Sequence, residues 1–248
     1  MITIKTEEEI QTMRESGKIL ATVLKEIEKQ VKPGITTLEL DRAAEALILS
    51  YGAKPGFKGY DGFPYSLCAS VNENIVHGYP SNYVLKDGDI IGLDLGVLYK
   101  GYNSDMAITV PVGNVSFEAK RLIMVTKKAL KRGIKKTRPG NTTGDIGNTI
   151  QRYVESQGYG IVRDLCGHGI GKELHEDPKV PNFGKRGGGE KLVEGMVICI
   201  EPMVTAGDYK LIKSKDGYGY ATKDGLLSAH FEHTIAITKK GAKVLTEV

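Results

Sequence analysis

Two stretches decide how this chain folds: DGDIIGLDLG at residues 87–96 and EGMVICIEPM at residues 194–203. Each begins with an acidic residue and a glycine, continues as a mainly apolar run, and carries a carboxylate at the same place, Asp94 or Glu201. Short apolar runs of this kind are typical of buried strands. An acidic side chain inside such a run is costly unless it is paired, protonated or bound to a metal. We therefore interpret the two stretches as equivalent strands of a repeated unit.

The repeat extends outward from these two strands. KPGITT at residues 32–37 returns as RPGNTT at residues 138–143, and each copy leads into a predicted helix that ends near a glycine, Gly52 or Gly158. Further matched positions are Cys68 and Cys166, His77 and His175, Pro80 and Pro178, and the strand openings at Asp105 and Glu232. An ordered series of matches predicts one domain over residues 1–248, with pseudo-twofold halves at approximately 32–113 and 138–241.

The expected elements are helices grouped with antiparallel strands, which is the α+β class. The predicted helices cover residues 6–31, 36–51, 116–133 and 142–157. The predicted strands cover residues 66–71, 89–98, 102–110, 196–203, 226–229 and 231–238, and residues 182–195 are expected to form a loop. Thr36 and Glu39 have the spacing of a capping box, and either Asn141 or Thr142 can cap the corresponding helix of the second half.

The predicted hairpin at residues 89–110 decides whether Asp94 and Asp105 share a face of the sheet. A two-residue turn at 99–100 puts the two aspartates directly opposite one another, whereas a turn at 100–101 makes them diagonal neighbours on the same face. A three-residue loop separates them onto opposite faces. Two solvated aspartates and a pair bridged by a cation are both compatible with the hairpin taken alone.

The second half favours the bridged pair. Glu201 repeats the position of Asp94 and Glu232 repeats that of Asp105, so the internal symmetry brings four carboxylates together. Four converging carboxylates indicate two divalent metal ions with shared ligands. Oxygen-rich ligation with a histidine suits manganese, iron, cobalt or zinc.

The chain has five histidines. His168 lies in the sequence CGHGIG, where the flanking glycines let the backbone approach a ligand closely, although a glycine-rich turn with an incidental histidine fits the same pattern. His77 and His175 occupy equivalent places in the repeat, as expected of two residues that flank one groove. His230 and His233 are interpreted as structural or merely exposed.

Composition excludes several classes of protein. With 40% hydrophobic and 26% charged residues in 248, the chain is an ordinary globular sequence. Its three cysteines include no CxxC pair, which favours a reducing compartment and argues against thiolate zinc sites. The polar, acidic N-terminal stretch is not a signal peptide, so we expect a cytoplasmic protein. A net charge of +4 is too small to identify a nucleic-acid binder.

Over essentially its whole length the sequence resembles the type I methionine aminopeptidases. The matching stretches are SVNENIVHGYP (70–80), DIIGLDLGVLYKGYNSDMA (89–107), GHGIGKELHEDP (167–178), ICIEPM (198–203) and FEHT (231–234). The resemblance implies the pita-bread fold and hydrolysis of the bond after an N-terminal methionine. It implies five metal ligands, Asp94, Asp105, His168, Glu201 and Glu232.

The resemblance also implies roles around the metals. Glu201 would move the proton of the attacking water, His175 would stabilise the carbonyl oxygen, and His77 would contact the peptide beyond the scissile bond. The implied methionine pocket consists of Tyr60, Phe63, Cys68 and Tyr218. The chain departs from the family at two places: Tyr218 stands where many bacterial members have tryptophan, and Phe57 stands where relatives commonly have a small residue.

Two other functions fit the same pattern. A proline-specific aminopeptidase or dipeptidase of this fold would use the same ligands, and a non-catalytic binding protein of this fold would typically lose them. The family suggests a monomer whose partners are N-terminal methionyl peptides and nascent chains.

A basic stretch runs from Lys127 to Arg138. It has two interpretations, a solvated helix face or a contact with ribosomal RNA near the nascent-chain exit. Its cations are Lys127, Lys128, Lys131, Arg132, Lys135, Lys136 and Arg138.

Overall fold

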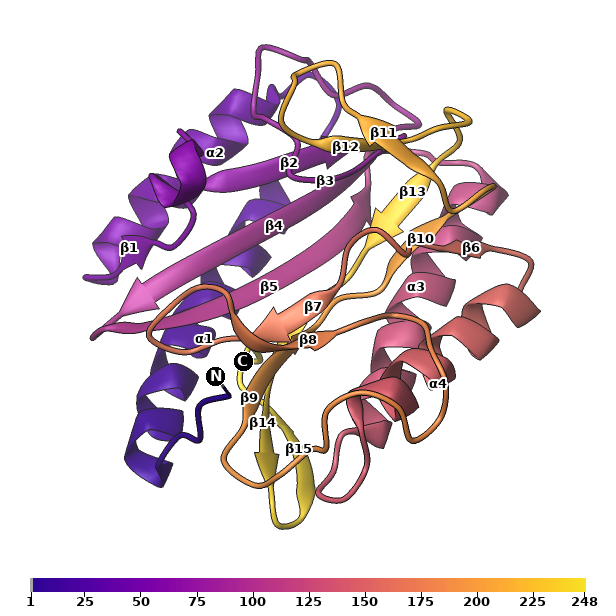
Figure 1. Cartoon of the computed structure of the whole chain (residues 1–248). Coiled ribbons are helices and arrows are strands. Elements are labelled where there is room, and N and C mark those ends of the chain that lie inside the picture. The colour runs from indigo at the N-terminus through magenta and orange to yellow at the C-terminus, as the bar shows by residue number, and fades with distance from the viewer. Residues whose placement is uncertain (1) are drawn as a thin grey trace.

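Helices flank a set of antiparallel sheets in the computed structural model, which describes residues 2–248 (Figure 1). The helices are α1 (Glu7–Gln30), α2 (Thr37–Ser50), the 3₁₀ turn η1 (Tyr60–Gly62), α3 (Phe117–Lys136) and α4 (Thr143–Ser156). The earlier strands are β1 (Lys54–Pro55), β2 (Leu67–Val71), β3 (Asn74–Val76), β4 (Ile90–Tyr99) and β5 (Tyr102–Pro111). The later strands are β6 (Gly160–Ile161), β7 (Gly167–Gly169), β8 (Glu176–Val180), β9 (Val197–Ile200), β10 (Met203–Thr205), β11 (Leu211–Lys213), β12 (Tyr220–Thr222), β13 (Ser228–His230), β14 (His233–Thr238) and β15 (Gly241–Val244). Every strand pairing among the described residues is antiparallel, and the α+β class is confirmed.

The helix ends follow the predicted signals. The Thr36 side chain accepts a hydrogen bond from the Glu39 amide and the Glu39 side chain accepts one from the Thr36 amide, which completes a capping box. At the start of α4, Thr142 is the residue that caps. Gly52 and Gly158 have φ of 69° and 82°, the left-handed conformation expected just beyond a helix. No helix of residues 2–248 combines the length and apolarity needed to cross a bilayer.

Each pair of helices packs into a core of its own. In Figure 1, α1 and α2 lie on one side of the molecule and α3 and α4 on the other, with β4 and β5 running between them. The first core joins α1 and α2 to β4 through fully buried leucines such as Leu24, Leu40 and Leu93. The second core joins α3 and α4 to β9 and β14 through residues such as Ile146 and Ile198. The pseudo-twofold relation between the halves stays a prediction.

The β4–β5 hairpin has the second of the three predicted geometries. Tyr99 pairs with Tyr102, so Lys100 and Gly101 form a two-residue turn in which both have positive φ, 48° and 82°. The register pairs Gly96 with Asp105 and Asp94 with Ala107. The two aspartates are therefore diagonal neighbours on one face, and both are buried.

Strand β5 also joins the two halves of the molecule. A row of hydrogen bonds connects alternate residues of β5 with alternate residues of the segment that runs from β13 into β14. The bonds connect Asp105 with Thr234 (2.9 and 2.8 Å), Ala107 with Glu232 (2.9 Å) and Thr109 with His230 (2.8 and 2.9 Å). The acidic residues of the two halves are thus held in a fixed register across the junction.

Candidate active site

Four carboxylates meet at this junction. Asp94 comes from β4, Asp105 from β5, Glu201 from the residue after β9, and Glu232 from between β13 and β14. Donor atoms of Asp94, Asp105 and Glu232 lie within 4.8 Å of one another, and Glu232 belongs to a second such group with Glu201 and His230. The structure therefore brings together the four carboxylates that the repeat predicted to converge.

The donor atoms of this cluster fit divalent cations. Four of its buried atoms have no hydrogen-bond partner among residues 2–248: Asp94 Oδ1, Asp105 Oδ1, Glu232 Oε1 and His230 Nε2. Each buried polar atom without a partner costs about 1–3 kcal/mol. A divalent cation would satisfy these atoms, and a set of carboxylate oxygens with imidazole nitrogen suits a first-row transition metal.

Without a cation the carboxylates are protonated more readily than usual. Burial, followed by the nearby negative charges, raises the pKa values of Asp105, Glu201 and Glu232 well above their ordinary range, and burial raises the pKa of Asp94. A positive charge among these groups would favour their ionised forms and lower the same pKa values. Proton release and metal binding are therefore linked in this cluster.

His168 is oriented as a metal ligand. Its Nδ1 lies 2.8 Å from the Gly169 carbonyl oxygen, which can only accept, so Nδ1 carries the proton and Nε2 presents its lone pair. Nε2 lies 3.8 Å from Glu201 Oε1 and 4.0 Å from Asp105 Oδ2. Burial lowers the pKa of His168 to about 3, which keeps the imidazole neutral.

The glycines beside His168 allow β7 to approach neighbouring strands. The predicted close approach of this backbone to a ligand stays a prediction. A Cβ on Gly167 would lie 2.3 Å from the Cys199 carbonyl oxygen, and one on Gly169 would lie 2.1 Å from that of Asp177. The glycines therefore position the backbone that carries His168.

His77 and His175 lie beside the cluster, as the repeat predicted. The Nδ1 atom of His175 lies 2.8 Å from the Tyr60 hydroxyl, and its ring meets the ring of His168 edge-on at a centroid distance of 4.4 Å. His77 has a φ of 59°, a left-handed conformation that non-glycine residues rarely adopt. Desolvation, followed by the charge of His175, lowers the pKa of His77 to about 4, so this imidazole is neutral near pH 7.

A cavity of about 340 Å³ adjoins the carboxylates. All four residues proposed for the methionine pocket line it: Tyr60, Phe63, Cys68 and Tyr218. Phe57 lines it as well, in the space over Gly96, where a Cβ would lie 2.6 Å from the Phe57 ring. The cavity is also lined by residues that were not predicted: Asp61, Leu165, Leu174, Lys213 and Tyr220. Leu174 precedes His175 directly, which is the one signal that could have identified it.

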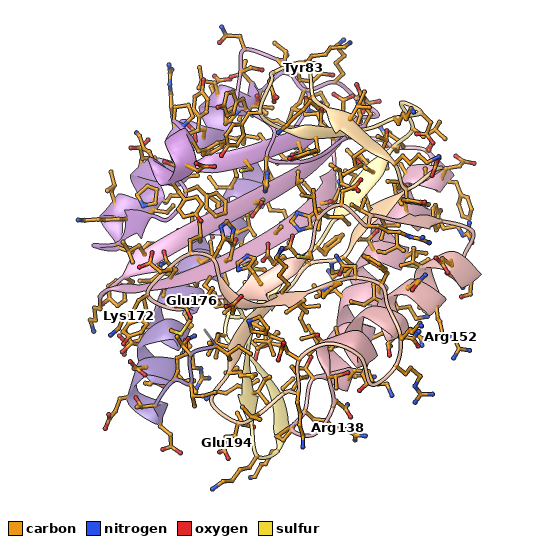
Figure 2. All side chains as sticks on the ribbon, viewed as in Figure 1. Tyr83, Arg138, Arg152, Lys172, Glu176 and Glu194 are labelled. Carbon is orange, nitrogen blue, oxygen red and sulfur yellow. The ribbon has the colours of Figure 1, made fainter. Side chains whose placement is uncertain are left out.

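A second, larger cavity of about 820 Å³ opens from the same site. The two cavities share His77, Leu165, His168, His175 and Glu201. Beyond this shared rim the larger cavity runs past charged residues of both signs, which include Lys5, Glu9, Lys172 and Glu176. In Figure 2, Glu176 lies left of the centre of the view and Lys172 lies further left, toward the edge of the molecule. A chain could therefore pass from the smaller pocket outward along the larger one.

Of the two interpretations of His230, structural or exposed, the exposed one is wrong. His230 is buried, and its Nε2 lies 3.6 Å from Glu201 Oε2 and 3.8 Å from Glu232 Oε2. Strand alternation could have shown this, because residues 230 and 232 face the same side and residue 233 faces the other. His233 is half-buried and its Nδ1 lies 2.9 Å from the Thr246 hydroxyl, in agreement with a structural role.

Known proteins resemble this chain in sequence and in structure. The sequence model of metallopeptidase family M24 matches residues 11–239. A methionine aminopeptidase of Clostridium perfringens is 52% identical over 246 residues, which cover 99% of each chain. The crystal structure of a methionine aminopeptidase from Thermotoga maritima superposes with a TM-score of 0.98 at 44% identity, and each chain covers all of the other. A prolidase from Pyrococcus furiosus superposes with a TM-score of 0.81 at 28% identity, and the match covers 99% of this chain but 65% of that one.

Proposed function

The chain belongs to metallopeptidase family M24 and has its pita-bread fold, and we propose that it hydrolyses the peptide bond after an N-terminal methionine. The observation that carries the proposal is that the carboxylate cluster and a wall of aromatic and aliphatic side chains line one small pocket. The flexible thioether of methionine packs well against aromatic rings such as Phe63 and Tyr218. A metal-dependent aminopeptidase of this kind needs both features within the reach of one residue.

The proposed cofactor is a pair of divalent ions of cobalt, manganese, iron or zinc. The residues that would hold them are Asp94, Asp105, His168, Glu201 and Glu232. When bound, such ions supply Lewis-acid activation of a water molecule, whose pKa falls to about 7. The unpartnered buried oxygens of the cluster support this ligand set.

Residues in and around the cluster have further roles in the proposed reaction. We propose that Glu201 removes the proton of the attacking water and delivers it to the leaving amine, since Glu201 faces both cavities. His175 would donate a hydrogen bond to the carbonyl oxygen as negative charge develops there. The hydrogen bond between its Nδ1 and the Tyr60 hydroxyl would keep the ring in place. His77 would contact the peptide just beyond the scissile bond.

Peptide cleavage tests the function directly. Purified protein with added manganese or cobalt is incubated with Met-Ala-Ser and with an Ala-Pro peptide. We expect methionine release from the first peptide and little cleavage of the second. Cleavage of the Ala-Pro peptide alone would establish the proline-specific alternative. Failure to cleave either peptide, together with failure to bind metal, would establish a non-catalytic binding protein.

The second residue of the substrate is expected to be small. With methionine in the smaller pocket, the next residue must pass the rim that His77 and His175 form with Glu201. In a series of Met-Xaa-Ser peptides, we expect kcat/KM for lysine, leucine or phenylalanine at the second position to be at least about tenfold below that for alanine, glycine or serine. Rapid cleavage of Met-Lys or Met-Phe peptides would contradict this steric explanation.

The proposed setting of the reaction is the cytoplasm, where nascent chains begin with methionine, and the proposed form is a monomer. The three cysteines are free, which supports a reducing compartment. We further propose a contact with ribosomal RNA through the basic stretch. Its residues Lys128, Arg132 and Lys136 line a groove of about 560 Å³ between α3 and α4. Across this groove lies Arg152, which points outward at the edge of the view in Figure 2.

Neutralising the groove is expected to weaken ribosome binding and leave peptide cleavage unchanged. The variant replaces Lys128, Arg132 and Lys136 with glutamine, which removes three cations that face phosphate groups in the proposed contact. Co-sedimentation with ribosomes at increasing salt measures the effect, and we expect both the bound fraction and its salt dependence to fall. The matched control makes the same replacement at three exposed cations of α1, Lys18, Lys25 and Lys29. Equal co-sedimentation of both variants and the parent would make the stretch an ordinary solvated helix face.

A further inference from the structure

His230 is the one histidine at the carboxylate cluster without an assigned task. Its Nε2 atom is buried and has no hydrogen-bond partner among residues 2–248. A buried imidazole nitrogen in this state is costly unless something absent from the polypeptide satisfies it. The atoms that surround Nε2 are carboxylate oxygens of Glu201 and Glu232.

The two oxygens of Glu201 each face a histidine. Oε1 lies 3.8 Å from His168 Nε2, and Oε2 lies 3.6 Å from His230 Nε2. Both separations exceed the length of a hydrogen bond. They are the separations expected of two ligand atoms that share one cation, because metal–ligand distances of about 2.1 Å allow ligand atoms to lie up to about 4.2 Å apart. His230 thus has the same relation to Glu201 as the predicted ligand His168.

The backbone fixes His230 in this place. Its amide donates to the Thr109 hydroxyl at 2.9 Å, and that hydroxyl donates to the His230 carbonyl at 2.8 Å. His230 also pairs with Met203 of β10, two residues beyond Glu201. Since alternate residues of a strand face one side, the ring of His230 follows Glu232 into the cluster.

We propose that His230 is a sixth protein ligand of the metal centre and that its Nε2 binds the cation shared by Glu201 and Glu232. The inference rests on the proposed function, because it deepens the same divalent metal site. It extends the ligand set drawn from the sequence, in which His168 is the one nitrogen donor. The oxygen-rich cluster would then bind first-row transition metals through two imidazoles.

Spectroscopy of the cobalt-loaded protein tests the ligand directly. In ¹H NMR, the ring N–H of a histidine bound to Co²⁺ gives a strongly shifted, exchangeable resonance. We expect two such resonances in the parent protein, and the loss of one in His230→Leu. One resonance in the parent, lost in His168→Leu, would overturn the proposal. The count in the parent decides the question even if a variant fails to fold.

Metal affinity gives a second readout that does not depend on catalysis. Titration calorimetry with Mn²⁺ is expected to show at least about tenfold weaker binding for His230→Leu, and partial recovery for His230→Gln, whose amide oxygen can still reach the cation. The control is His233→Leu, which changes a neighbouring histidine on the opposite face and is expected to leave the affinity unchanged. Unchanged affinity in His230→Leu would overturn the proposal. If the parent bound no divalent cation, the proposed metal centre would fail as well, whereas a parent that binds metal and cleaves methionyl peptides with one imidazole ligand would overturn the role of His230 alone.

Discussion

Replacing Glu201 with glutamine is expected to lower kcat for Met-Ala-Ser by at least about 100-fold at saturating metal. Glutamine keeps the size of the side chain and one oxygen that can still bind a cation, but it cannot accept a proton. Of the four clustered carboxylates, Glu201 is the one that lines both cavities, so it alone meets the path that water and the peptide share.

The effect should lie in the chemical step. Steady-state kinetics over a range of metal and peptide concentrations would show kcat reduced and KM changed little. Glu194→Gln is the matched control, because Glu194 opens the same repeated motif but is exposed and points away from the molecule at the bottom of Figure 2. Near-normal turnover of the Glu201 variant would remove Glu201 from its role as the base.

The features of the site that could be predicted share a local origin. The periodicity of the strands and the repeat of the motifs placed Asp94 and Glu201 at equivalent points. The geometry of the hairpin, however, depends on whether Lys100 or Tyr99 begins the turn, and the sequence permits both. The structure shows positive φ at Lys100 and Gly101, which decides the register and makes the aspartates diagonal neighbours.

What could not be predicted depends on contacts between the halves. The row of hydrogen bonds from β5 to the β13–β14 segment has no sequence motif, yet it holds Glu232 in register with the aspartate strand of the other half. Similarly, Phe57 fills the space over Gly96 because two distant backbones approach closely. A glycine marks where such a contact can form, but it does not identify the side chain that fills it.

Removing the metal with a chelator is expected to abolish peptide cleavage. It is also expected to make the free energy of unfolding fall as pH rises near neutrality. Burial raises the pKa values of Asp105, Glu201 and Glu232 in the folded, metal-free protein. In the unfolded chain these groups titrate near pH 4. Between that pH and their raised values, the folded protein therefore binds more protons than the unfolded chain, and its free energy of unfolding falls as pH rises.

The metal-loaded protein should respond in the opposite direction. Cations bind the deprotonated carboxylates, so their affinity increases as pH rises. Saturating metal at 1,000 times its Kd stabilises the folded state by about 4 kcal/mol. We therefore expect the difference in Tm between loaded and chelated protein to widen from pH 6.5 to pH 8.5, as measured by differential scanning calorimetry.

The buried histidines limit, at its acidic end, the pH range over which the stability of the metal-free protein falls as pH rises. Burial lowers the pKa values of His168 and His230 to about 3, so below pH 6.5 the unfolded chain gains protons that the folded protein cannot bind. That contribution raises stability as pH rises and opposes the effect of the carboxylates. The variant Asp105→Asn separates the contribution of the histidines from that of the carboxylates. It keeps both histidines but removes one carboxylate and its repulsion of the others. In chelated protein, we expect the fall of Tm with pH to be shallower in this variant than in the parent. An equal or steeper fall in the variant would mean that the clustered carboxylates do not carry the pH dependence.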